Sequence, residues 1–192
     1  MIVKSYEIKK NKNLLKKNNF YLLYGENFGL KKDLKDIIKL AIGQKNESLE
    51  ILSIYESEII DDEENFYNSI YSGSLFSNKK IIIISEATDK IIKKINNIYN
   101  DYSANVFFII FSEILEKKSK LRNYFEKSKQ HGVTACYADN EISIKKIIFN
   151  KLRDYQGLTS NIVDIIIQNT GTDRNKINNE IDKIISCFLD KK

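Results

Sequence analysis

The residues best suited to phosphate chemistry lie between a predicted strand and a predicted helix near the start of the chain. Residues 20–24 read Phe-Tyr-Leu-Leu-Tyr, which is typical of a buried strand, and apolar residues recur at helical spacing from Leu30 onward. A phosphate-binding loop in this position has the pattern G-x-x-x-x-G-K-[ST], whose N–H groups, lysine and metal-bound hydroxyl converge on the phosphates. With the pattern aligned on Gly25, its lysine is Lys31, but Leu30 replaces the second glycine. Lys32 replaces the hydroxyl residue and cannot coordinate Mg²⁺, so we predict a loop of this class that does not bind nucleotide.

A second position of the same class follows the apolar run 80–84. In such ATPases the corresponding strand ends in Asp-Glu, where the aspartate holds the metal and the glutamate polarises the attacking water. Here Ser85 stands at the aspartate position, and Glu86 has no metal to work with. Each position alone could be an ordinary strand-to-helix connection, but both together favour a nucleotide-binding fold that has lost its nucleotide. An active P-loop ATPase remains the alternative, because Lys31 is retained.

The third candidate is an adjacent leucine and phenylalanine, Leu75 and Phe76, preceded by Ser74. One interpretation is that both side chains close the core at the end of a helix. However, adjacent side chains point about 100° apart on a helix and to opposite faces of a strand, so they cannot readily enter one core. The serine, glycine and asparagine residues on either side are typical of turns. We therefore predict an exposed Leu-Phe pair.

Charge points only weakly to a partner. The 192 residues include 31 Lys or Arg and 26 Asp or Glu, a net charge of +5 that permits contact with nucleic acid without requiring it. Lys117, Lys118 and Lys120 follow the fourth predicted strand, where they could contact a phosphate backbone or simply form a solvated lysine surface. A DNA-binding accessory module is thus a second alternative.

Composition excludes several other classes. No run approaches the ~20 apolar residues of a membrane span, and the start of the chain lacks the apolar stretch of a signal peptide. Two cysteines and one histidine are too few for a disulfide framework or a zinc site. We therefore expect a cytoplasmic protein without a metal or other cofactor.

Predicted strands alternate with helices through the first two thirds of the chain, which indicates a parallel sheet with helices on its faces. The expected strands are 20–24, 49–54, 80–85, 105–111 and 133–137, and the expected helices are 29–42, 62–71, 90–99 and 119–129, preceded by an amphipathic segment from residue 5 to about 17. The fold class is therefore α/β, with a five-stranded sheet of the P-loop NTPase type in a domain spanning residues 1–139.

A small helical domain is expected over residues 140–192. The first helix is predicted to end at Gly157, the second to begin after Thr159 and end at Gly171, and the third to begin after Thr172 or Asp173. No Gly/Pro-rich linker precedes this three-helix lid.

Several strings spread along the chain together resemble one family. They match the delta subunit of the bacterial DNA polymerase III clamp loader, an AAA+-like (AAA+/RecA-like) subunit that opens the sliding clamp without hydrolysing ATP. The matching strings are Phe20-Tyr21-Leu22-Leu23-Tyr24-Gly25-Glu26, Ser74-Leu75-Phe76, residues 79–84 before Glu86-Ala87, residues 117–121, and Gly171-Thr172-Asp173 leading to residues 179–184.

The resemblance implies a function for the Leu-Phe pair. Delta subunits insert such a pair into a hydrophobic pocket beside the subunit interface of the clamp, which assigns clamp binding to Ser74, Leu75 and Phe76. The implied partners are the sliding clamp (beta subunit), the other clamp-loader subunits in the full-length protein, and primer–template DNA in the assembled loader. Family members also carry a C-terminal helical collar that holds the loader together, and this sequence ends where the collar would begin. We therefore expect a monomer that contacts the clamp but does not join a loader.

Overall fold

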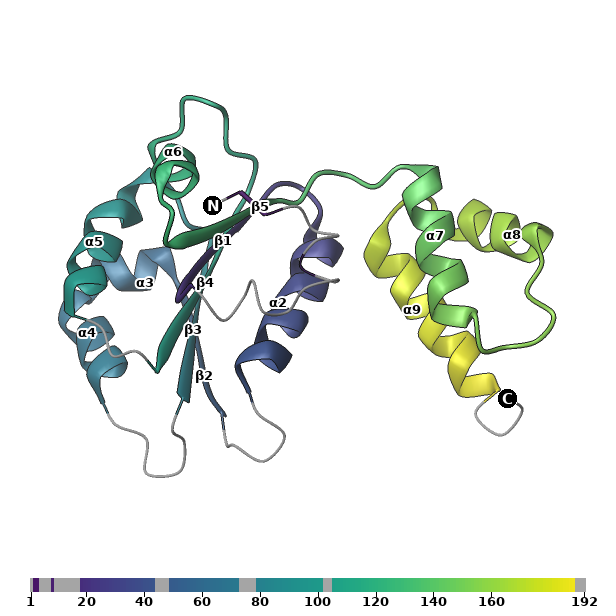
Figure 1. Ribbon diagram of the computed structural model, residues 1–192, viewed down its shortest axis with the longest axis horizontal. Helices are drawn as coiled ribbons and strands as arrows, with labels where there is room; N and C mark the ends of the chain where they lie inside the picture. The colour runs from purple at the N-terminus through teal and green to yellow at the C-terminus, as the bar shows by residue number, and fades with distance from the viewer. Residues whose placement is uncertain are drawn as a thin grey trace. The chain divides into compact units, whose positions relative to one another are not determined.

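The computed structural model describes residues 2–3, 8, 18–43, 49–72, 79–101 and 105–188 (Figure 1). The chain divides into two compact units. The first, here called the sheet unit, contains Met1–Glu26 and Lys31–Cys136. The second, the helical unit, contains Asn27–Leu30 and Tyr137–Lys192.

The sheet unit is built on a five-stranded parallel sheet with strand order β2-β3-β4-β1-β5. The central strand β1 is buried along its whole length, as its unbroken run of apolar and aromatic residues predicts. The predicted α/β fold class is confirmed. The strands are β1 (Phe20–Tyr24), β2 (Leu49–Tyr55), β3 (Lys79–Ser85), β4 (Val106–Ser112) and β5 (His131–Ala135).

Helices cover both faces of the sheet (Figure 1). One face packs against α3 to α6 through a core in which Phe20, Phe108 and Phe125 are fully buried. Helix α2 covers the other face and buries Leu34 and Ile38. The helices are α2 (Phe28–Ile42), α3 (Glu56–Asp61), α4 (Glu63–Tyr71), α5 (Ile92–Asp101) and α6 (Lys120–Lys127), with a 3-10 turn, η2, at Asp89–Ile91.

Two elements of the sheet unit differ from the sequence prediction. Helix α3 was not expected, because six residues are too few to show a helical period. It begins where the Glu58 carboxylate accepts a hydrogen bond from the Tyr55 N–H, and it buries Ile59. Strand β5 begins two residues before its predicted start, at His131. Gly132 lies inside this strand, where a Cβ would collide with the ring of Tyr21 on β1, so the close packing requires a glycine.

The helical unit contains α7 (Glu141–Leu152), α8 (Ser160–Thr170) and α9 (Arg174–Cys187). Each helix begins after a polar cap: Asn140, Thr159 and Asp173. The first helix ends at Leu152, earlier than the predicted Gly157, whereas α8 ends before Gly171 as predicted. The core of the helical unit is aliphatic and contains Ile144, Ile148, Leu152, Val163, Ile166, Ile177 and Ile181. No helix in the described ranges is long and apolar enough to cross a membrane.

Candidate functional sites

Lys31, the lysine of the predicted phosphate loop, bonds inside the sheet unit. Its Nζ atom donates to the carbonyl oxygen of Ser112, at the end of β4, over 3.1 Å, and its side chain is buried. Burial lowers the pKa of Lys31, while nearby Glu113 and Glu26 act in the opposite direction. The ammonium group is therefore held by a backbone carbonyl in the described structure.

The backbone of Gly25 is also closed inward. Its N–H donates to the Glu113 carbonyl oxygen over 3.0 Å, and the Cys136 N–H donates to the Tyr24 carbonyl oxygen over 2.6 Å. Gly25 has a φ of 126°, and a Cβ at this position would collide with the carbonyl oxygen of Cys136. A glycine is thus required by the close approach of the chain after β5, with no need for a phosphate to explain it.

The helix that follows the loop is capped by Asn27. Its side-chain oxygen accepts a hydrogen bond from the Leu30 N–H over 2.9 Å. Its side-chain nitrogen donates to the Tyr137 carbonyl oxygen over 3.0 Å and to Asp139 Oδ2 over 2.8 Å, within the helical unit. One of the N–H groups at a helix N-terminus, which in phosphate-binding loops would face the ligand, is therefore satisfied by a side chain.

A buried ion pair joins the same group of residues. Arg174, the first residue of α9, donates from Nε and Nη2 to the two oxygens of Asp139, each over 2.6 Å. Ser143 Oγ donates a further hydrogen bond to Asp139 over 2.7 Å. Burial alone would raise the pKa of Asp139, but hydrogen bonds from Arg174, Asn27 and Ser143 outweigh it and lower the pKa. A Cβ on Gly29 would lie 2.8 Å from the Arg174 Cβ, so only glycine permits this approach.

The sequence alone does not reveal this ion pair. Asp139 and Arg174 are 35 residues apart, and each stands beside a more conspicuous helix cap, Asn140 and Asp173. No spacing rule connects them, because the pairing depends on how α7 and α9 pack. A buried arginine could have been suspected only from its place at the start of an amphipathic helix.

Ser85 and Glu86 lie at the carboxyl end of β3. Ser85 is half-buried, whereas Glu86 is exposed and has a φ of 58°, a left-handed conformation that is uncommon outside glycine. Glu86 lies on the rim of an open hollow of about 1040 Å³ in the sheet unit. The charged residues that line this hollow are of both signs: Lys90, Lys118 and Lys120 with Glu86, Asp89, Glu113 and Glu116.

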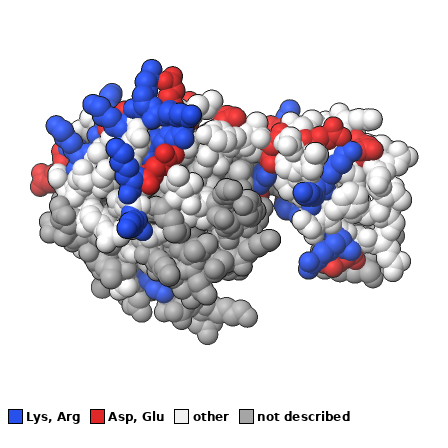
Figure 2. All heavy atoms as spheres, turned by 45° about the horizontal axis from the view of Figure 1, so that its top comes forward, with Lys and Arg blue, Asp and Glu red and all other residues white. Residues whose placement is uncertain are grey.

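The lysine cluster after β4 is exposed and mixed with acidic residues. Lys117, Lys118 and Lys120 are all exposed, and Figure 2 shows Lys and Arg gathered over this end of the sheet unit with Asp and Glu among them. Lys118 pairs with Glu116 over 2.9 Å. The Asp89 carboxylate accepts from the Ser119 hydroxyl and from two backbone N–H groups at the start of α6. The N-terminus of α6, the helix nearest these lysines, is therefore already bound by a carboxylate of the protein itself.

The predicted clamp-binding residues Ser74, Leu75 and Phe76 lie outside the described residues. Both flanks of this segment are described. Helix α4 ends at Tyr71, with the Ser72 N–H donating to the Asn68 carbonyl oxygen over 2.8 Å. Strand β3 begins at Lys79.

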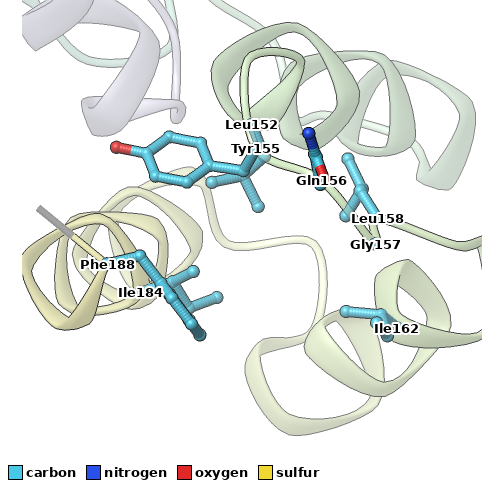
Figure 3. A pocket seen from close by; sticks show the side chains of 8 residues that line it. All are labelled: Leu152, Tyr155, Gln156, Gly157, Leu158, Ile162, Ile184 and Phe188. Atoms are coloured by element: carbon cyan, nitrogen blue, oxygen red, sulfur yellow. The ribbon is translucent and has the colours of Figure 1, made fainter. Parts of the chain in front are cut away.

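The helical unit contains a hollow of about 430 Å³ (Figure 3). It is lined by side chains of all three helices and of the segment between α7 and α8: Leu152, Tyr155, Gln156, Gly157, Leu158, Ile162, Ile184 and Phe188. None of these lining residues is charged, so this hollow does not suit a nucleotide phosphate.

Comparison with known proteins identifies the family. Residues 21–137, more than half of the chain, match the family described as DNA polymerase III, delta subunit. The chain belongs to this family. A curated delta-family relative, the probable DNA polymerase III subunit delta of Rickettsia prowazekii (strain Madrid E), is 28% identical over 133 residues. That match covers 68% of this chain and 38% of the relative.

Solved structures with the same fold include a delta protein. The Bacillus subtilis DNA clamp loader delta protein matches with a TM-score of 0.62 at 13% identity, covering 98% of this chain and 58% of that one. Domain III of the Thermotoga maritima replication initiation protein DnaA matches with a TM-score of 0.56 at 15% identity, covering 96% and 82%. At these identities the likeness shows the fold alone. The chain spans less than two thirds of the length of both delta relatives.

Proposed function

We propose that this delta-family chain binds the sliding clamp with Ser74, Leu75 and Phe76 and holds one ring interface open for loading onto DNA, without binding ATP itself. The observation that carries the proposal is the family match over residues 21–137, a range that includes the Leu-Phe pair. An adjacent apolar pair between turn-forming residues also suits an exposed anchor better than a core position. In this role the chain is a clamp-loader component and not an enzyme.

Energy limits what such an anchor can do. Burying a leucine and a phenylalanine completely contributes roughly 1.5–3 kcal/mol each, and association costs reduce this total. Only the part of this energy that is larger in the open clamp than in the closed clamp can drive opening. The pair therefore stabilises an open interface, and the timing of exposure is left to ATP used by other loader subunits.

Three contacts support independence from ATP. Lys31 donates to Ser112, the Gly25 N–H donates to Glu113, and Asn27 caps the helix that follows the loop. A phosphate group would have to displace these bonds before it could use the same donors. Leu30 and Lys32 add the loss of the second glycine and of the metal-binding hydroxyl.

For a full-length protein of the family, the proposal extends to the other clamp-loader subunits, and to primer–template DNA in the assembled loader. DNA contact would use Lys117, Lys118 and Lys120, whose exposure favours it and whose acidic neighbours weaken it. With three phosphate contacts, log affinity should fall with log salt concentration with a slope of about −3 and no steeper. Binding to a primer–template duplex at several salt concentrations, with and without lysine-to-alanine changes, measures this slope.

The deciding experiment measures binding to the cognate sliding clamp. We expect the double variant L75A/F76A to lose at least about 3 kcal/mol of binding free energy, as an aromatic-aliphatic hot spot would. L40A is the matched control, because Leu40 is 71% exposed on α2 and lies outside the proposed surface. Equal clamp affinity of L75A/F76A and L40A would contradict the proposal.

A further inference from the structure

Lys80, the second residue of β3, places a buried cation beside the end of α4. Its Nζ atom donates to the carbonyl oxygen of Ser69 over 2.7 Å and to that of Ser72 over 2.8 Å. It also lies 3.3 Å from the Ser72 hydroxyl and 3.4 Å from Glu50 Oε1 on β2. Only 6% of the residue is exposed. All four groups belong to the sheet unit.

These contacts satisfy carbonyl groups at the C-terminal end of α4, which in many helices are bound by a residue of the same helix. The last carbonyl groups of a helix have no partner within it, and cations near this end are favoured by the helix dipole. In α4 the cation comes instead from the strand that follows. Ser72 already has an extended backbone, with φ −60° and ψ 123°, so the chain leaves the helix at the point where Lys80 holds it.

Lys80 therefore connects the two described flanks of the segment 73–78. Ser72 is the last described residue before the segment 73–78, and β3 begins immediately after it. The strand side is fixed separately, because the Lys80 N–H donates to the Asn105 carbonyl oxygen over 3.0 Å and Lys79 Nζ donates to the Ile42 carbonyl oxygen over 3.1 Å. The Lys80 ammonium group also fixes the residues before the segment, at the end of α4, to this strand.

We propose that Lys80 is a positioning residue for clamp binding, acting through the Leu75–Phe76 pair. The inference rests on the proposed function, since it concerns the same segment. Fixing both ends of a binding segment reduces the conformational entropy that it loses when it binds. Without the ammonium group, the exit of α4 loses its two carbonyl contacts, and the segment binds the clamp more weakly even where the fold is intact.

The test compares two lysines that bind opposite ends of α4. K80M removes the contacts to Ser69 and Ser72, whereas K94M removes the ion pair to Glu63 in the first turn of the same helix. We expect K80M to weaken binding to the cognate clamp about tenfold, measured well below the unfolding temperature, and K94M to leave it within about twofold. Equal affinities for K80M and K94M would overturn the proposal. If K80M does not fold, K80Q takes its place in the same comparison.

A double-mutant cycle with F76A separates positioning from general stability. If Lys80 acts through the Leu-Phe pair, K80M costs less than about twofold in clamp affinity once Phe76 is removed. An undiminished tenfold loss in the F76A background would show that Lys80 acts elsewhere. Failure of the proposed function looks different: L75A/F76A would then bind the clamp like the unmodified chain.

Discussion

The two edges of the sheet use buried lysines in opposite ways. At the carboxyl ends of β1 and β4, Lys31 donates to Ser112 beside the loop that the sequence aligns with a phosphate-binding pattern. At the amino end of β3, Lys80 donates to Ser69 and Ser72, which precede the segment that carries the Leu-Phe pair. Both ammonium groups are held by backbone carbonyl oxygens. The two lysines therefore use the same chemistry in different settings. At the carboxyl edge the loop bonds to neighbouring residues of the sheet unit, whereas the amino edge flanks a proposed binding segment.

The largest expected effect comes from breaking the ion pair between Asp139 and Arg174. Replacing Asp139 by alanine leaves the Arg174 guanidinium buried without its carboxylate and removes one hydrogen-bond partner each from Asn27 and Ser143. We expect a loss of about 3–5 kcal/mol in the free energy of unfolding, measured by urea denaturation. D154A is the control, since Asp154 and its partner Arg153 are largely exposed and their pair is worth ~1 kcal/mol or less. Similar midpoints for D139A and D154A would mean that this ion pair does not stabilise the helical unit.

The next effect tests the amino edge through pH. His131 begins β5 and is surrounded by the rings of Phe20, Tyr99, Tyr124 and Phe125, with centroids 5.0–5.5 Å from its own. Burial lowers the pKa of His131 to about 4 from an ordinary value of 6.5, so the folded state favours the neutral ring. As the pH falls below 6.5 the unfolded chain takes up a proton that the folded chain does not. Stability should therefore fall between pH 6.5 and 4, by roughly 3 kcal/mol in total, and this contribution should level off below pH 4.

The control for this titration is H131F, which keeps an aromatic ring and removes the proton site. Urea denaturation of both proteins from pH 7 to 4 gives the difference in slope. Parallel pH profiles for the unmodified chain and H131F would assign the acid sensitivity to other groups, such as the carboxylates near α6 and α9.

The strands were predictable because their chemistry is local. Apolar runs located all five strands to within two residues at their starts, and the caps Thr159 and Asp173 marked helix starts. Helix α3 was missed because it depends on tertiary contacts. The buried Glu56 carboxylate accepts hydrogen bonds from both the N–H and the hydroxyl of Thr88, in the loop after β3. Such a contact leaves no periodic signal in the sequence.

The candidate sites divide in the same way. The departure from the phosphate-loop pattern at Leu30 and Lys32 could be seen in the sequence, because the pattern itself is contiguous. The partners that fill the loop could not, since Ser112 is 81 residues from Lys31. The contacts of Lys80 were hidden for a different reason. The carbonyl groups that it binds are only 8 and 11 residues away, but a lysine at the start of an apolar strand resembles an ordinary surface residue.

A smaller effect on stability is expected for the proposed binding residues after Ser72 than for a core residue before it. We expect L75A/F76A to leave the urea midpoint nearly unchanged, because truncating exposed side chains costs little. F66A, in the middle of α4, should cost about 3–5 kcal/mol, since Phe66 is fully buried in the core of the sheet unit. A sharp fall in the midpoint of L75A/F76A would place the pair in the core and remove it as a binding surface.

The smallest expected effect is none at all, and it bears directly on the closed edge. Millimolar Mg-ATP should leave the melting temperature unchanged, because the donors of the loop are engaged with Ser112, Glu113 and Asn27. The measurement is sensitive: a ligand present at 100 times its dissociation constant stabilises the folded state by about 2.7 kcal/mol, which corresponds to a shift of several degrees. K31M makes the result interpretable. A rise in the unmodified chain that disappears in K31M would show that Lys31 leaves Ser112 for a phosphate, and the contrast between the two edges would then be one of regulation and not of permanent closure.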